Sequence, residues 1–103
     1  MISTSTSAIE YAWKQLSDKF SSQQFPPTAV ENEVFQRLGA ESAFSTCLAL
    51  RSDSKRDPHP RELMDDLSRH YVLQYPLQAN KTMREVMFRE GVKAFVHYVK
   101  VNL

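Results

Sequence analysis

Apolar residues recur at helical spacing along most of the chain, most densely between Thr82 and Leu103. At about 100° per residue this stretch has two apolar arcs that together cover most of its circumference. One arc holds Met83, Val86, Met87, Ala94, Tyr98 and Val101, and the other holds Phe88, Val92, Phe95, Val96, Val99 and Leu103. A helix that is apolar on most sides has to be surrounded by other protein. We therefore expect a long, largely buried C-terminal helix that starts at a capping box formed by Thr82 and Glu85.

The N-terminal stretch has a single apolar stripe. Following a capping pair of Ser7 and Glu10, the stripe consists of Ile9, Trp13, Leu16 and Phe20. This spacing predicts a one-faced helix of about four turns. We expect Trp13 and Phe20 to share one core with Leu67 and Phe95 of the later helices.

A second stripe follows Pro26 and Pro27, and it changes phase at a glycine. Thr28 and Glu31 have the spacing of a helix start, and the stripe then runs through Val30, Val34, Phe35 and Leu38. After Gly39 it continues on another face with Ala40, Phe44, Cys47 and Leu48. This pattern predicts two helical pieces that meet at an angle, with Gly39 as a cap or kink. No basic residue adjoins Cys47, so we expect a buried, unreactive thiol.

Residues 52–60 contain no large apolar side chain and include Pro58 and Pro60. They predict the one long loop of the chain, either a solvated crossover or a functional segment. Asp57 and Pro58 have the residue types of a helix cap and first position. The following helix is expected to run to about Gln74, where Pro76 stops it.

Composition supports an all-α fold and restricts the partners. The 103 residues are 42% hydrophobic and include only two glycines, too few for the tight turns of a β-rich protein. We predict one domain over residues 1–103, a compact bundle of four to five helices around the C-terminal one, with residues 1–6 flexible. The net charge of +1 gives no overall attraction to nucleic acid or membrane. With one cysteine, no signal peptide and no long apolar run, the expected location is cytoplasmic.

No arrangement of residues predicts catalysis, a cofactor or a metal. Neither glycine has a second glycine at the spacing of a phosphate loop, and no Gly-x-Ser-x-Gly elbow is present. His59, His70 and His97 fall in three different segments. Asp66 and His70 are four residues apart, but two ligands do not make a metal site, and ion pairs at this spacing are common on helices. We expect a protein that is not an enzyme.

Two classes of binding function remain. The first is a protein-interaction module, a small regulator, adaptor or inhibitor, and a homodimer that buries the surplus apolar surface of the C-terminal helix. The second is a nucleic-acid-binding regulator that uses residues 61–101 as a helix-turn-helix-like unit. The charge balance and the acids within the basic row favour the first. The expected partner-binding residues are a basic edge and two adaptable methionines, together with Arg84 at the helix start: Arg84, Arg89, Lys93, His97, Lys100, Met83 and Met87.

Overall fold

The computed structural model of the protein describes residues 4–20, 30–73 and 82–103. These residues form four α-helices and one 3₁₀ helix, and they contain no strand: α1 Thr4–Phe20, α2 Glu31–Asp53, η2 Pro60–Leu63, α3 Met64–His70 and α4 Met83–Asn102. The predicted all-α bundle with a long C-terminal helix is confirmed.

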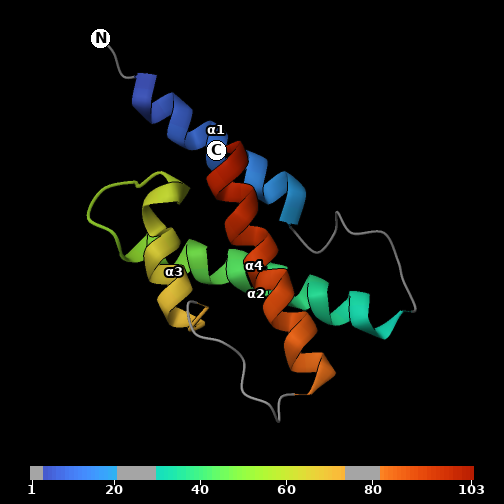
Figure 1. The fold of residues 1–103 in the computed structure, drawn as a ribbon. Helices are drawn as coiled ribbons and strands as arrows, with labels where there is room; N and C mark the ends of the chain where they lie inside the picture. The colour runs from blue at the N-terminus through green and yellow to red at the C-terminus, as the bar shows by residue number, and fades with distance from the viewer. Residues whose placement is uncertain (1–3, 21–29, 74–81) are drawn as a thin grey trace.

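The two longest helices, α2 and α4, cross near their middles and form the largest helix–helix interface (Figure 1). Figure 1 also shows α1 lying across the C-terminal end of α4 and α3 running beside it. The chain's two glycines both lie at the crossing. A Cβ at Gly39 would be 2.8 Å from the carbonyl carbon of Phe88, and one at Gly91 would be 2.8 Å from that of Gln36. Glycine is therefore required here because the two backbones touch.

The prediction of two helical pieces at Gly39 is wrong, since α2 is one continuous helix of 23 residues. The change of stripe has another physical cause. On α2, the residues around Gly39 face the crossing with α4, and residues farther along the helix also face the core beneath α1 and α3. A glycine in the middle of a helix, away from either cap, indicates that another backbone approaches closely.

The predicted core is confirmed, because Trp13, Phe20, Leu67 and Phe95 all belong to one cluster of buried residues. Phe95 is fully buried, and its ring meets that of Phe20 edge-to-face with the centroids 4.9 Å apart. Cys47 lies in the same cluster, and burial raises the pKa of its thiol to about 12. The cysteine is therefore protonated and unreactive at neutral pH, as expected.

Of the two apolar arcs of α4, only one is buried in the single chain. Val92, Phe95 and Val99 face the core and are fully buried. On the other arc, Met83 and Val101 are exposed, at 60% and 64%. Tyr98 of the same arc is half-buried against Phe20 of α1, so the exposed apolar surface of this arc is concentrated at the two ends of α4.

The loop between α2 and η2 is shorter than predicted and is bound to the helices around it. It spans residues 54–59, because α2 continues to Asp53. The indole N–H of Trp13 donates to the carbonyl of Pro58 at 2.8 Å, and Arg51 forms a two-point ion pair with Asp57 at 2.6 and 3.0 Å. Arg51 also lies over the Trp13 ring. Asp57 is not the predicted helix cap, because its carboxylate is taken by Arg51.

The cap that starts η2 is His59, with Pro60 at the first helical position. Its Nδ1 accepts from the N–H of Arg61 at 3.1 Å, while Glu62 accepts from the N–H of His59 at 2.8 Å. This is a capping box in which histidine takes the place of serine or threonine. The proline was predicted at the right kind of position, but two residues too early.

Other predicted helix ends differ from the structure. Helix α1 starts at Thr4, so Ser7 is inside the helix, residues 4–6 are helical, and residues 1–3 lie outside the described part of the chain. Helix α2 starts after Val30, which makes no side-chain cap, and Thr28 is not described. The Thr82 cap of α4 is confirmed, because its hydroxyl accepts from the N–H of Glu85 at 3.2 Å.

Candidate groove between α3 and α4

An open groove of about 570 Å³ lies between α3 and α4. Its two apolar lining residues are Val96 of α4, which is 7% exposed, and Leu73, just after α3, which is half-buried. The other six lining residues are polar or charged: Asp65, Ser68 and Arg69 from α3, and Lys93, His97 and Lys100 from α4. All of these except Asp65 and Ser68 are basic residue types. The groove therefore combines a small apolar floor with a mostly basic rim.

Helix α3, which forms one wall of this groove, ends in a tight turn. Helix α3 stops at His70, earlier than the predicted Gln74, which itself lies outside the described residues. The N–H of Leu73 donates to the carbonyl of Ser68 at 2.9 Å and that of Val72 to Arg69 at 3.1 Å, the bonds of a Schellman turn. Val72 has a φ of 56°, which is costly for a β-branched residue.

Arg89 holds this turn against α4. Its guanidinium donates to the carbonyls of Val72 and Leu73, at 3.2 and 2.9 Å. The Tyr71 ring lies 6.4 Å from that of Phe88, the neighbour of Arg89. The end of α3 thus packs beside the N-terminal half of α4, and the two helices are antiparallel. The first residues of α3 consequently lie toward the C-terminal half of α4.

Tyr71 also ties the same turn to α2. Its hydroxyl is 2.6 Å from the Ser42 hydroxyl and 3.0 Å from that of Thr46. The turn that follows α3 is therefore bonded to both α2 and α4.

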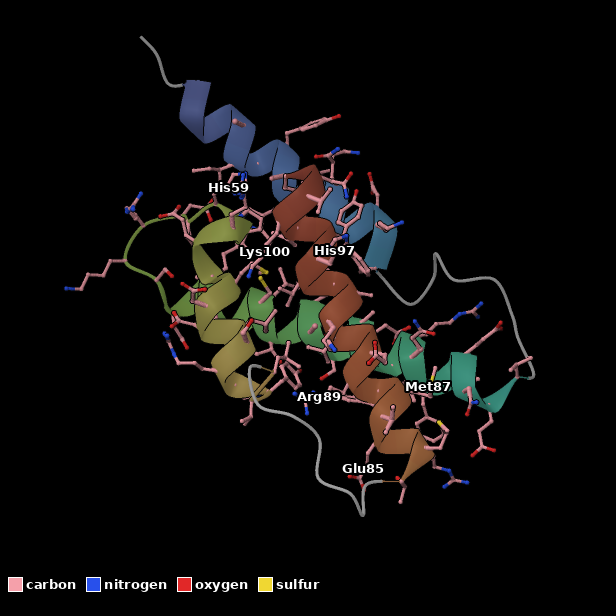
Figure 2. All side chains as sticks on the ribbon, viewed as in Figure 1. His59, Glu85, Met87, Arg89, His97 and Lys100 are labelled. Atoms are coloured by element: carbon pink, nitrogen blue, oxygen red, sulfur yellow. The ribbon has the colours of Figure 1, made fainter. Side chains whose placement is uncertain are left out.

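The structure separates the predicted partner-binding residues into three groups. Lys93, His97 and Lys100 come together on the groove. Arg89 is on the same side of α4, as Figure 2 shows together with Lys100, but it is half-buried and bonded to the α3 turn. Arg89 therefore differs from the other residues of the predicted basic edge, because it is half-buried and donates to two backbone carbonyls of the same chain.

The other three predicted residues lie away from the groove. Arg84 pairs with Glu31 of α2 at 2.6 Å and lies over the Phe35 ring. Met87 is half-buried on the side of α4 opposite Arg89 and Lys100 (Figure 2), and Met83 is exposed at the start of the helix. The seven residues do not form one surface.

The charges on the groove are exposed and only partly paired. Lys93 lies 3.6 Å from Glu90, and Arg69 pairs with Asp66, each through exposed side chains. Pairs of this kind contribute about 0–1 kcal/mol, so a partner carboxylate can replace them. Within the described segments, neither His97 nor Lys100 forms an ion pair.

Sequence reasoning missed the α3 wall of the groove. The pattern puts Asp65 and Arg69 on the polar side of their helix and Val96 on an apolar arc of the C-terminal helix, and it gives no role to Ser68 or Leu73. Arg69 could have been found from its position, because a base in the last turn of a helix that precedes another helix can lie beside the second helix's basic row.

The histidines and acidic residues of the described segments are dispersed. Among residues 8–20, 30–73 and 82–103, no three His, Cys, Asp or Glu side chains gather as metal ligands. Asp66 pairs with Arg69 rather than with His70, whose ring lies 4.9 Å from that of Tyr71.

Comparison with protein-family models, curated protein sequences and solved structures finds no match to this chain. None of the described helices is long and apolar enough to cross a lipid bilayer.

Proposed function

We propose that this protein is a non-enzymatic interaction module that binds a partner protein in the groove between α3 and α4. The observation that carries the proposal is the composition of the groove. Lys93, His97, Lys100 and Arg69 stand around an apolar floor. A basic rim steers and orients an acidic partner, while burial of the floor adds stability to the complex.

The alternative, nucleic-acid binding through a helix-turn-helix-like unit, has weaker support. Residues 71–82 separate α3 from α4, whereas such units use a turn of about three to four residues. The start of α4 would have to face the bases, yet Arg84 is paired there with Glu31 and is followed by Glu85. A groove with an apolar floor also suits side chains better than phosphates.

The proposal is tested by reversing charge on the groove. Lys93→Glu with Lys100→Glu is compared with Lys14→Glu and Lys55→Glu, which change the net charge equally at exposed positions outside the groove. Each variant is first checked for an unchanged melting temperature and then used, beside the wild type, to purify partners from the source cells.

We expect proteins that bind the wild type and the control variant to be lost from the groove variant. Their association rate should fall more than their dissociation rate rises, because exposed charges mainly steer encounter. Equal recovery by all three proteins would contradict the proposal. Recovery of nucleic acid alone, with a log–log salt slope of about 0.9 per phosphate for duplex DNA, would support the alternative.

A further inference from the structure

The basic residues of the groove form a row along α4. Lys93, His97 and Lys100 are four and three residues apart, and so they lie on one side of the helix. At 1.5 Å per residue their positions rise by about 6 Å and then about 4.5 Å along the axis. A second helix lying along the groove would meet them with residues at the same four- and three-residue spacing.

The walls of the groove favour a helical occupant over an extended one. An extended peptide binds well where a sheet edge or free backbone groups can pair with its own N–H and C=O groups. Both walls here are helices, whose backbone groups are bonded within α3 and α4 or, at the end of α3, to its turn and to Arg89. A helix satisfies its own backbone and needs only side-chain contacts.

The two ends of the groove differ in charge. Arg69 and Lys93 both line it, while Asp65, the one acid among the lining residues, lies in the first turn of α3. Because α3 and α4 are antiparallel, Asp65 lies toward the Lys100 end. A partner carboxylate is thus attracted all along the α4 row and most weakly near Asp65.

We propose that the partner segment is an acidic amphipathic α-helix, an inference that rests on the proposed function. It presents Asp or Glu side chains at four- and three-residue spacing to Lys93, His97 and Lys100. An apolar side chain of the same helix packs on Val96 and Leu73.

The test is selection from a displayed library of random 18-residue peptides on the full chain. Peptides that also bind the Lys93→Glu, Lys100→Glu variant are removed. We expect the enriched peptides to carry acids at i, i+4 and i+7 if they run parallel to α4, or at i, i+3 and i+7 if they run antiparallel, with apolar residues on the adjoining face. A synthetic copy of an enriched peptide should lose about tenfold or more in affinity for the groove variant. Acidic peptides without this spacing, proline-containing motifs, or no enrichment would overturn the inference.

Asp65→Asn supplies a second test that does not weaken the groove. Removing the Asp65 carboxylate, which repels the acids of the peptide, should increase the affinity of the same peptide about two- to fivefold. Asp53→Asn is the control, because it makes the same change of charge at an exposed position. An unchanged affinity would contradict the placement of the peptide beside Asp65. If cellular partners depend on Lys93 and Lys100 but no helical peptide is selected, the proposed function stands and the acidic-helix inference fails. If neither depends on them, both fail.

Discussion

Gly39→Ala should destabilise the protein, although the same change inside an ordinary helix is stabilising. The added Cβ would lie 2.8 Å from the carbonyl carbon of Phe88 and 3.1 Å from its Cα, and closer still to the carbonyl oxygen. Ordinary carbon–oxygen contacts are about 3.3–3.6 Å. The obstacle is the backbone of α4, which cannot rotate away as a side chain can. The two helices must therefore move apart.

The magnitude follows from two opposing effects. Overpacking of this kind costs about 1–3 kcal/mol and occasionally more, and a rigid obstacle places Gly39 near the upper end of that range. Alanine regains about 1 kcal/mol through its higher helix propensity. The expected net loss is about 2 kcal/mol. Gly91→Ala should behave alike, because its Cβ would lie 2.9 Å from the backbone nitrogen of Ala40.

Urea unfolding followed by circular dichroism measures both losses. Ala49→Gly, at an exposed position of α2, is the control for helix propensity and should cost about 1 kcal/mol. The double variant Gly39→Ala, Gly91→Ala should lose less than the sum of the single losses, because one separation of the helices relieves both clashes. A Gly39→Ala protein that is more stable than the wild type would refute the close crossing.

Four further outcomes are expected. Val72→Gly should stabilise the protein by about 0.5–1 kcal/mol in urea unfolding, because relief of the positive φ outweighs the added freedom of the unfolded chain; a loss would mean that the turn is not strained. Phe95→Ala should cost about 3–5 kcal/mol, and a loss below about 1 kcal/mol would mean that the site is not core. Cys47 should react with a thiol reagent only as fast as the protein unfolds, and rapid labelling of the native state would contradict its burial. Arg51 lowers the pKa of Asp57, so this carboxylate stabilises the fold above its ordinary pKa and loses that contribution as the pH falls through its lowered value. The urea midpoint of Asp57→Asn should therefore fall less on acidification than that of the wild type, and an equal fall would argue against the ion pair.

Helices and core could be predicted because they depend on local pattern. The stripe through Trp13 and Phe20, the Thr82 cap and the buried positions around Phe95 follow from spacing alone. Gly39 was misread because a sequence shows an interruption of the stripe without showing the second helix that causes it.

The remaining differences arise from contacts between distant residues. Trp13 fixes the loop through Pro58, 45 positions away, and no local pattern predicts that bond. Arg89 lies in the same basic row of the sequence as Lys93 and Lys100, yet its guanidinium donates to carbonyls in the turn after α3. Only the α4 wall of the candidate site was predictable, because its basic row belongs to one helix, whereas the opposite wall depends on how α3 packs.

If partners bind between α3 and α4, binding should change the surroundings of both helices at the groove. Backbone amide chemical shifts of the labelled protein, recorded with and without a captured partner, measure this change. The largest shift changes should fall in residues 65–73 and 93–100. Changes centred instead on the exposed arc of α4 at Met83 and Val101, or on α1, with the groove unaffected, would contradict binding in the groove.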